Sequence, residues 1–381
     1  GTSFSTYEPS GFQKTQNSKP EGDQMVFAGP AEEASVMRVC YVVPQNLALV
    51  NGGVKTQALQ TIEAVKKLGV KPVLLQPWQQ LNEHEIDLVH IFHAGAETLE
   101  VARKFHELSK PVLLSPVFYT RHKAAVIRRS RKLESITGKW FKGIRTDYSL
   151  KASVCEIAQH IAPNTAAEAA LIEKGFGISP ENITIIPNGV EKRFTEATPD
   201  NFRQIYGERE FILFAGQAGA PRKGLITLLE AAKNLQTELF VIGDLYNDAY
   251  GNSCRKYFEK YQHYHQLPNL PHDSALLASA YAACKVFVLP SLYETPGIAA
   301  LEAALGGAEI VITEKGGTRE YFGDYAEYIT PYSVPSVREA IQKALKKESG
   351  SGLKNHILEK YTWQAVGWQT FQLYKKISGI G

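Results

Sequence analysis

The sequence predicts an α/β protein built from two doubly wound parallel sheets. Its 381 residues exceed what a single hydrophobic core usually serves, so two domains are expected. Short apolar runs alternate along the chain with segments whose apolar residues recur at helical spacing. These runs show little alternation between polar and apolar residues, which is typical of strands that helices cover on both faces.

The apolar runs form two successive series, which predict one domain over residues 37–190 and a second over 191–356. The strands expected in the first domain are 38–44, 71–75, 87–92, 111–116, 160–164 and 182–189, with helices over 54–69 and 96–109. The strands expected in the second domain are 211–216, 238–244, 285–291, 309–314 and 326–331. The boundary falls near PNGVEKRF, where Pro187 and Gly189 interrupt the pattern.

The two ends of the chain differ from this alternating pattern. A last helix over 357–377 follows no strand, and we expect residues 357–381 to pack back across both domains. Residues 1–36 are rich in Ser, Thr, Gln, Gly, Pro and Glu and show no apolar period, which predicts a weakly structured tail or linker.

The composition is that of a soluble globular protein, with 44% hydrophobic and 21% charged residues. A formal net charge of +3 is too small to indicate a dedicated nucleic-acid-binding protein. The four cysteines, Cys40, Cys155, Cys254 and Cys284, form no C-x-x-C pair, so we expect free thiols in a reducing compartment. No apolar run reaches the roughly 20 residues that span a bilayer. No signal-peptide pattern opens the chain, so we expect a cytoplasmic protein.

One stretch, LYETPGIAALEAALGG (292–307), places two glutamates around the start of an expected helix. Thr295 is expected to cap this helix and Pro296 to be its first residue. The next three amides would then be free, namely those of Gly297, Ile298 and Ala299. Free amides and the helix dipole together form an anion site, most naturally for phosphate. Ligands of open parallel sheets bind at such places, beyond the carboxyl ends of the strands.

Each glutamate of this stretch allows two interpretations. Ile298, Leu301 and Leu305 recur at helical spacing and predict a buried stripe, with Glu302 beside it. Glu302 is then either a paired carboxylate at the rim of the core or an acceptor for vicinal hydroxyls such as those of a ribose. Glu294 is either a solvated loop acid or a group that faces the neighbouring part of the same ligand.

These residues also carry a family resemblance. PSLYETPGIAALEA (290–303) resembles the E-x7-E signature of family 4 glycosyltransferases, which are retaining enzymes with two Rossmann-like domains facing a cleft, the GT-B architecture. Four further stretches match the family in order: NGGVKTQ (51–57), NTAAEAALIEKGFGISPENITIIPNGVEKRF (164–194), FILFAGQAGAPRKGLITLLEAA (211–232) and EKGGTREYFGD (314–324). Together these stretches extend the resemblance across both expected domains.

The resemblance implies retaining transfer of a sugar from a nucleoside-diphosphate sugar, a UDP- or GDP-sugar, to an acceptor hydroxyl. The product would be a glycan, a polysaccharide or a glycolipid. The second domain would hold the donor and the first would receive the acceptor. Glu302 would bind the donor ribose, and Glu294 would contact the transferred sugar or the diphosphate. Lys223 would neutralise charge on the departing diphosphate, and Thr295 with the three free amides would complete the donor site.

The sequence departs from the family pattern in the first loop of the second domain. The family carries Gly-Arg there, whereas Gly216 is followed by Gln217, which lacks the fixed charge and the bidentate donor of arginine. Either Arg222 or Arg319 replaces that charge, or both are exposed basic side chains. This departure motivates a rival hypothesis, a transferase-like binding or scaffolding domain without turnover. A sugar-nucleotide epimerase of similar fold is a second rival.

The first domain holds the expected acceptor side. Gly52 and Gly53 either bring amides toward the diphosphate or form a tight turn, and both interpretations can hold together. Many relatives carry a histidine after the fourth strand, where this chain has Pro-Val. His93 and His122 are the nearest alternatives, and a structural role is the other interpretation of each.

No metal or other cofactor is expected. The chain has no D-x-D motif, and helix amides with Lys223 would supply positive charge at the diphosphate. The histidines of QHYHQLPNLPHD (262–273) are more typical of a surface loop with aromatic packing than of a metal site.

Residues 121–145 hold nine Lys and Arg against one Glu, with Trp140 and Phe141 between them. They form either a solvated basic face or a patch for an anionic membrane surface or a phosphate-bearing acceptor. Acceptors in the resembling family are often lipid-linked, which favours peripheral contact with the inner face of a membrane.

Overall fold

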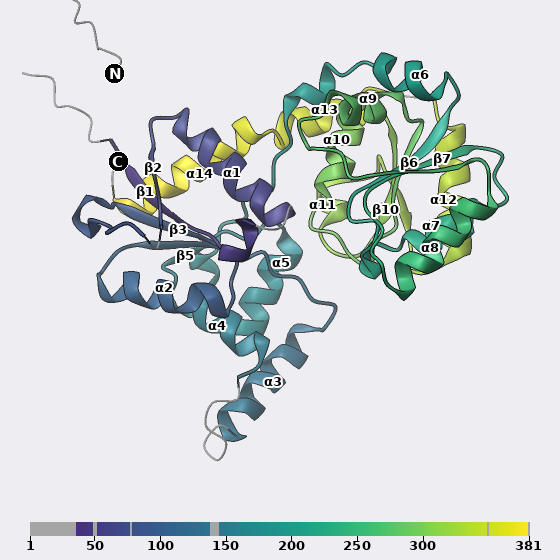
Figure 1. Ribbon diagram of the computed structural model, residues 1–381. Helices are drawn as coiled ribbons and strands as arrows, with labels where there is room; N and C mark the ends of the chain where they lie inside the picture. The colour runs from purple at the N-terminus through teal and green to yellow at the C-terminus, as the bar shows by residue number, and fades with distance from the viewer. Residues whose placement is uncertain (1–35, 49–51, 77, 138–144, 349, 380–381) are drawn as a thin grey trace, which may run out of the picture. The chain divides into compact units, whose positions relative to one another are not determined.

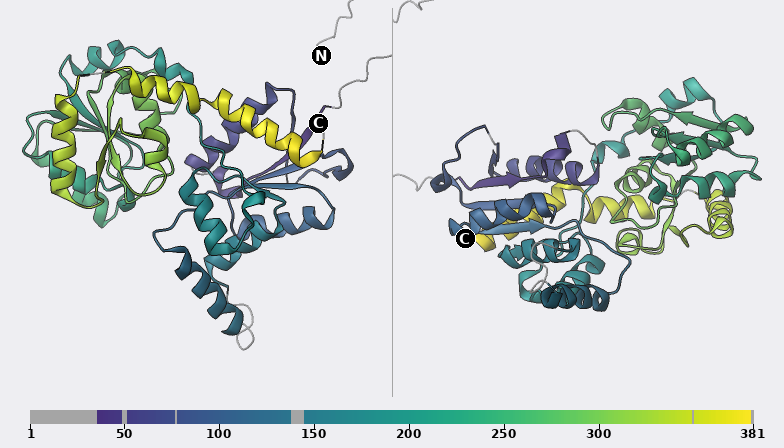
Figure 2. Two further views of the ribbon diagram at one scale, coloured as in Figure 1. Left: turned by 180° about the vertical axis from the view of Figure 1, so that it is seen from behind. Right: turned by 60° about the horizontal axis from the view of Figure 1, so that its bottom comes forward.

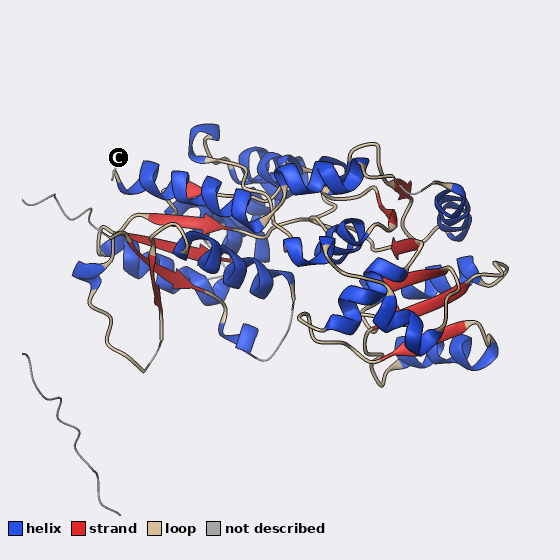
Figure 3. Ribbon diagram, turned by 90° about the horizontal axis from the view of Figure 1, so that it is seen from above, coloured by secondary structure: helices blue, strands red, loops and turns tan. Residues whose placement is uncertain are grey.

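The computed structural model describes residues 36–48, 52–76, 78–137, 145–348 and 350–379, and among them the chain forms two parallel sheets in succession (Figures 1 and 3). The predicted α/β fold class with two doubly wound parallel sheets is therefore confirmed. The domain boundaries remain predictions. The tail predicted over 1–36 lies outside the described residues, apart from Val36.

The first sheet has the strand order β2-β1-β3-β4-β5, with parallel pairing throughout. Its strands are β1 (Arg38–Val42), β2 (Lys71–Leu74), β3 (Leu88–Phe92), β4 (Val112–Ser115) and β5 (His160–Ile161). The helices of this half are α1 (Gly53–Lys66), α2 (Ala96–Glu107), α3 (Ala124–Thr137), α4 (Asp147–Ile157) and α5 (Ala166–Leu171). The order reverses between β1 and β3, and such a reversal opens a crevice at the carboxyl ends of the two strands.

The second sheet has the order β11-β10-β9-β6-β7-β8 and is also parallel. Its strands are β6 (Phe211–Ala215), β7 (Glu238–Ile242), β8 (Tyr264–Leu267), β9 (Val286–Leu289), β10 (Glu309–Thr313) and β11 (Glu327–Ile329). Its helices are α6 (Asp200–Tyr206), α7 (Leu225–Ala232), α8 (Ala249–Lys260), α9 (Ala275–Ala283), α10 (Ile298–Gly306), α11 (Thr318–Phe322) and α12 (Val334–Lys346). Here the order reverses between β6 and β9.

The structure corrects the strand prediction in two places. Residues 182–189 form no strand; Ile183 makes one isolated parallel bridge to Ile161, and Pro187, which has no amide hydrogen, cannot extend the ladder. The strand β8 was not expected, because its sequence YHQL is too polar for the apolar pattern of a central strand. It lies at the edge of the sheet, where one side needs no strand partner.

The last predicted helix, 357–377, is in fact two helices, α13 (Gly352–Lys360) and α14 (Trp363–Ser378). They are separate because Thr362 caps α14 by accepting a hydrogen bond from the Ala365 amide. Helix α13 buries Ile357 in the core around the second sheet. Helix α14 packs along α1 and buries Tyr374 in the core around the first sheet (Figure 2).

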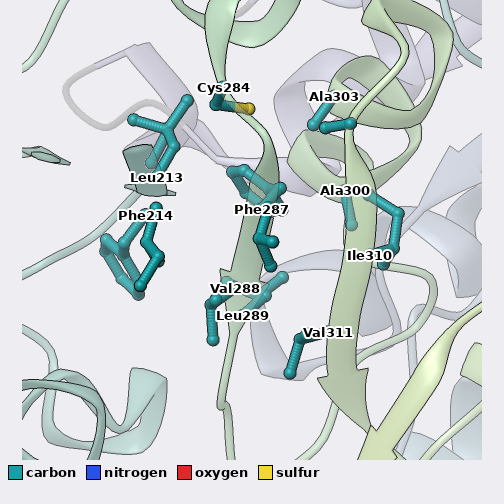
Figure 4. Close-up of a cluster of buried hydrophobic side chains, with 14 of the residues drawn as sticks. Leu213, Phe214, Cys284, Phe287, Val288, Leu289, Ala300, Ala303, Ile310 and Val311 are labelled. Carbon is teal, nitrogen blue, oxygen red and sulfur yellow. The ribbon is translucent and has the colours of Figure 1, made fainter. Parts of the chain in front are cut away.

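The second sheet is apolar because helices cover both of its faces. All residues of β6 and β9 are buried. On one face the small residues Ala300 and Ala303 of α10 lie against β9 and β10, which lets the helix approach closely (Figure 4).

The four cysteines are buried free thiols, as predicted. None of the helices in the described ranges is long and apolar enough to cross a bilayer.

A buried histidine connects α14 to the first sheet. His90 of β3 lies 2.7 Å through Nδ1 from the Tyr374 hydroxyl and 2.9 Å through Nε2 from Ser115 Oγ. Its ring stacks on Phe92 with 4.1 Å between centroids. Burial lowers the pKa of His90 to about 3, so this side chain stays neutral over most of the pH range.

We predict that His90 makes the protein less stable as the pH falls below about 6.5, because the unfolded chain then binds a proton that the folded chain excludes. One such group changes the free energy of unfolding by at most about 1.4 kcal/mol per pH unit. Urea unfolding of the wild type and His90→Gln at pH 7 and pH 5 measures this, and the variant should lose less stability between the two. The exposed His84→Gln is the control. Equal losses in wild type and His90→Gln would contradict the prediction.

Candidate active site

The clearest candidate site lies at the strand reversal of the second sheet. Lys223 follows β6 and Glu294 follows β9, and these two strands are neighbours. The two loops are joined by a hydrogen bond of 2.8 Å from the Leu292 amide to the Arg222 carbonyl. They come so close that a Cβ on Gly224 would lie 2.2 Å from the Pro290 carbonyl oxygen. Gly224 is also left-handed, with φ of +71°, so this position requires glycine.

Lys223 and Glu294 form a buried ion pair in these loops. Lys223 Nζ lies 2.5 Å from Glu294 Oε1, and the side chains are only 13% and 9% exposed. Ser291 donates a second hydrogen bond of 2.5 Å to the same oxygen. The interpretation of Glu294 as a solvated loop acid is therefore wrong. The sequence placed both residues near one diphosphate, and the structure brings them together.

The backbone around Glu294 is held by the turn after β10. The Glu294 amide donates to the Lys315 carbonyl at 3.1 Å, and the Gly317 amide donates to the Glu294 carbonyl at 3.0 Å. Gly316 lies so close that a Cβ there would be 2.0 Å from the Glu294 carbonyl oxygen, and its φ is +99°. Gly316 therefore lets this turn approach Glu294, whereas a Cβ on Gly317 would instead meet Thr165 at 2.1 Å.

The expected start of α10 is wrong. The helix begins at Ile298 with Gly297 as its N-cap, in a left-handed conformation with φ of +87°, so Thr295 does not cap it and Pro296 is not its first residue. The cause is the pairing of Glu294 with the β10 turn, which keeps the chain extended up to that residue. The first helical hydrogen bond joins the Ala300 amide to the Gly297 carbonyl, so the three expected amides, those of Gly297, Ile298 and Ala299, precede it.

Glu302 is more buried than its predicted place beside the apolar stripe of α10 implies. Helix α10 is buried from Ala300 to Leu305, so Glu302 is only 3% exposed, whereas Ile298 is half-buried. Its Oε1 lies 2.7 Å from Nε2 of His272. Burial, and next the nearby Glu302 charge, raise the pKa of Tyr281. The carboxylate is therefore paired, which agrees with one of its two interpretations and leaves the other open.

His272 contacts the candidate site residue Glu302, a contact that the sequence interpretation missed. The sequence interpretation assigned all histidines of residues 262–273 to one surface loop. In the structure they have different partners. His265 Nε2 lies 2.7 Å from Glu238, whereas His272 Nε2 lies 2.7 Å from Glu302. His272 and Glu302 are 30 positions apart in the sequence, so only the topology, which places both at the carboxyl edge of one sheet, could have suggested their contact.

Arg222 stands beside Gln217, where the family pattern has arginine. Its Nη2 lies 3.1 Å from Gln217 Oε1, and both side chains are exposed. Gly216, just before them, has φ of +143° and donates to the Ile242 carbonyl. Arg319 is occupied elsewhere, with its guanidinium 4.0 Å from the centre of the Tyr328 ring. Of the two arginines, only Arg222 contacts Gln217 among the described residues.

Gly52 and Gly53 lie at the start of α1, and neither is in a crowded turn. Gly52 is the N-cap of α1 with an extended φ of 179°, and both Gly52 and Gly53 are exposed. A Cβ on either would meet nothing within 4 Å, so no steric requirement for glycine is visible here. Both interpretations of these two glycines remain predictions.

The two histidines lie in different surroundings. His93 follows β3, next to the strand reversal of the first sheet, and has an unusual φ of +77°. Its Nδ1 is buried and has no hydrogen-bond partner within the described residues. Burial, and next the Lys151 ammonium, lower the pKa of His93. His122 is exposed and lies 2.7 Å through Nδ1 from the Tyr148 hydroxyl. Both lie near the first turns of α4, since Asp147 and Lys151 act on His93 and Tyr148 contacts His122.

Comparison with known proteins gives one family match for each half of the chain. The family described as "Glycosyltransferase Family 4" matches residues 66–194, and "Glycosyl transferases group 1" matches residues 198–362. A curated relative, the MMP α-(1→4)-mannosyltransferase of Mycolicibacterium hassiacum, is 27% identical over 66% of this chain. The match spans 63% of that relative, so this chain corresponds to about three fifths of its length.

Solved structures of low sequence identity share the fold. Sucrose-phosphate synthase from Thermosynechococcus elongatus superposes with a TM-score of 0.70 at 17% identity, covering 91% of this chain and 100% of that one. The Anabaena protein HepE in complex with UDP-glucose gives 0.63 at 16% identity, covering 89% and 100%. Together with the two family matches, these findings show that the chain belongs to the group 1 glycosyltransferases of GT-B architecture.

Proposed function

We propose that this protein transfers a sugar, with retention, from a nucleoside-diphosphate sugar to an acceptor hydroxyl in the synthesis of a glycan, polysaccharide or glycolipid. The observation that carries the proposal is the buried Lys223–Glu294 pair at the strand reversal. Glu294 lies in the loop that leads directly into the N-terminus of α10, and Lys223 reaches it from the loop after β6. A cation beside free helix amides suits a diphosphate, which carries negative charge that grows as the sugar departs.

In the proposed mechanism the protein contributes position and charge. The diphosphate lies against the amides of Gly297 to Ala299, and Lys223 stabilises it as the bond to the sugar breaks. An oxygen of the leaving diphosphate takes the proton of the acceptor hydroxyl on the same face, which gives retention. Glu294, fixed by Ser291 and the β10 turn, orients the sugar. Lys223 and the amides supply positive charge, so we propose that no divalent cation takes part.

Glu302 is proposed to accept hydrogen bonds from the donor ribose. We predict that Glu302→Gln weakens binding of UDP or GDP at least tenfold, because hydrogen bonds to a charged acceptor are worth roughly 1.5–3 kcal/mol each. Calorimetry measures the affinity. Since Glu302 is paired with His272, its neutralisation is also expected to lower the melting temperature, so affinity is the deciding quantity.

Glu238→Gln is a matched control for this prediction. Glu238 also accepts a bond of 2.7 Å from a histidine, but it lies at the amino end of β7, away from the proposed site. It should leave nucleotide affinity unchanged. An unchanged affinity in Glu302→Gln would show that this carboxylate serves the core alone and would overturn the ribose assignment.

We predict that Lys223→Met lowers kcat about a hundredfold or more, with a smaller change in KM, because its charge matters most as the diphosphate departs. The variant leaves Glu294 without its cation and should be less stable, whereas Lys223→Met with Glu294→Gln should regain stability but not turnover. Lys233→Ala, which removes a half-buried ion pair with Glu230 outside the proposed site, is the control. Rates are measured in EDTA with UDP-glucose and GDP-mannose. A kcat within threefold of the wild type would contradict the assignment.

The choice of donor is open between UDP- and GDP-sugars. The fold neighbour HepE was solved with UDP-glucose, which supports a UDP-sugar as the first one to test. A thermal-shift screen across UDP-, GDP- and ADP-sugars identifies the preferred base, since a ligand at 100 times its Kd stabilises the fold by roughly 2.7 kcal/mol. Binding without turnover would favour the rival hypothesis of a binding domain.

We also propose that α3 rests on an anionic membrane surface at the cytoplasmic side. Its exposed face carries Val126, Leu133 and Ile136, which are 45%, 62% and 53% exposed. Arg129 lies on the same face, and Arg128 and Lys132 border it; all three are exposed. An apolar stripe edged by basic residues is typical of helices that lie in the membrane interface. Figure 2 shows α3 away from the first sheet, on the far side of α4. The buried cysteines are free thiols, which suits a reducing compartment and so supports the cytoplasmic side in this proposal.

One basic residue of this segment does not belong to the proposed membrane face. Arg131 donates 2.6 Å to the Phe176 carbonyl and pairs with Glu156, so its guanidinium is used within the fold. Trp140 and Phe141, which the sequence interpretation also assigned to the patch, lie outside the described residues.

We predict that replacing Arg128, Arg129 and Lys132 with Ser weakens binding to phosphatidylserine vesicles at least tenfold at low salt, because each basic residue at such a surface contributes about 1 kcal/mol. Nucleotide affinity should not change. The control replaces three exposed lysines of the second half, Lys343, Lys346 and Lys360, and so removes the same charge. Vesicle sedimentation measures binding. Equal loss of vesicle binding in both triple variants, or no loss in either, would contradict the membrane proposal and favour the interpretation of this segment as a solvated basic face.

A further inference from the structure

The Glu302 carboxylate accepts a hydrogen bond from His272 and has room for more. The donor is Nε2 of His272, which lies 2.7 Å from Oε1. An ionised carboxylate only accepts hydrogen bonds, so Nε2 must carry the hydrogen. A carboxylate has about four lone-pair positions. A pair of vicinal hydroxyls needs two of them.

Tyr281 and His272, two polar side chains near Glu302, differ in how they are held. Tyr281 is 2% exposed, and its ring packs edge-on against Phe194 and Phe287. Burial, and next the Glu302 charge, raise the pKa of Tyr281 well above its usual value, so it remains a donor. The His272 side chain is 43% exposed and lies in the loop between β8 and α9. Of the two, His272 is the one that can be changed without opening the core.

His272 is itself kept in place by the segment before α6. Arg193 donates to the His272 carbonyl oxygen, and its guanidinium lies 4.1 Å from the centre of the Phe194 ring. The imidazole meets the same ring at 66° with 5.9 Å between centroids. Arg193 also pairs with Glu191, the other charged group near His272. These contacts fix the ring before any ligand binds.

We propose that His272 is a positioning residue for the nucleotide, which holds the Glu302 carboxylate in the orientation that accepts the ribose hydroxyls. The inference rests on the proposed function, in which Glu302 binds the ribose. Without His272, Glu302 is a buried carboxylate with one donor fewer, so it turns toward other donors or takes up a proton, and either change weakens its acceptance of hydroxyls. Because Glu302 acts in binding, His272 should affect Kd and KM of the donor and leave kcat nearly unchanged.

The test is a double-mutant cycle on the full chain with UDP and GDP as probes, measured by calorimetry, with kcat and KM for UDP-glucose and GDP-mannose alongside. His272→Ala should weaken the binding of whichever nucleotide the wild type prefers by about five- to tenfold, the worth of one hydrogen bond. His272→Gln keeps an amide donor and should stay within about threefold of wild type. In the Glu302→Gln background, His272→Ala should have no further effect.

His265→Ala is the matched control, because it removes a histidine–glutamate contact of the same 2.7 Å length in the same half of the chain. It should leave nucleotide affinity unchanged. Unaltered affinity in His272→Ala with weakened binding in Glu302→Gln would overturn this inference alone, as would equal effects of His272→Ala in both backgrounds. Unaltered affinity in Glu302→Gln, or a wild type that binds neither nucleotide, would overturn the proposed function and this inference with it.

Discussion

The reversal of strand order beside β6 is the constraint on which the site depends. The chain leaves β6 toward β7 on one side and returns to β9 on the other, so the helices after these neighbouring strands diverge. Helix α7 packs with α8 and α12, whereas α10 packs with α9 and α13, in separate layers on the two faces of the sheet (Figure 1). The crevice between them is filled by two loops, which meet through the Lys223–Glu294 pair.

Joining two loops by a buried ion pair costs free energy of desolvation. Removing two charges from water costs several kcal/mol for each ion, and their attraction together with further hydrogen bonds must offset that cost. Here Ser291 adds one such bond, and two glycines, Gly224 and Gly316, let three loops crowd around the pair. Apolar residues of the same size would serve stability as well or better. The retention of charge at this point therefore fits a role in ligand chemistry.

Much of this arrangement could be predicted from the sequence, for physical reasons that differ between elements. Strands such as β6 and β9 are continuous apolar runs between helical patterns, so local composition is enough to locate them. Lys223 and Glu294 were assigned through motif resemblance, since 71 residues separate them and no periodicity connects them. Their contact follows only once the strand order is known.

The remaining features depend on tertiary contacts that no local pattern records. The start of α10 is set by the pairing of Glu294 with the turn after β10, which overrides the preference of Thr295-Pro296 for a helix start. The contact of His272 with Glu302 depends on where the loop after β8 lies, and β8 itself is too polar to be recognised as a strand.

The chain crosses between its two halves twice, near Val190 and near Tyr361 to Trp363, and these two segments are hydrogen-bonded to each other. The Val190 amide donates 2.7 Å to the Tyr361 carbonyl, and the Trp363 amide donates 3.3 Å to the Val190 carbonyl. Gly189 leaves so little space that a Cβ there would lie 2.6 Å from the Trp363 ring. Because the two crossing segments are bonded to each other, they act as one double-stranded connection, and neither can bend without the other or without breaking these hydrogen bonds. A side chain larger than hydrogen at position 189 would force the two segments apart, so the integrity of this connection depends on glycine.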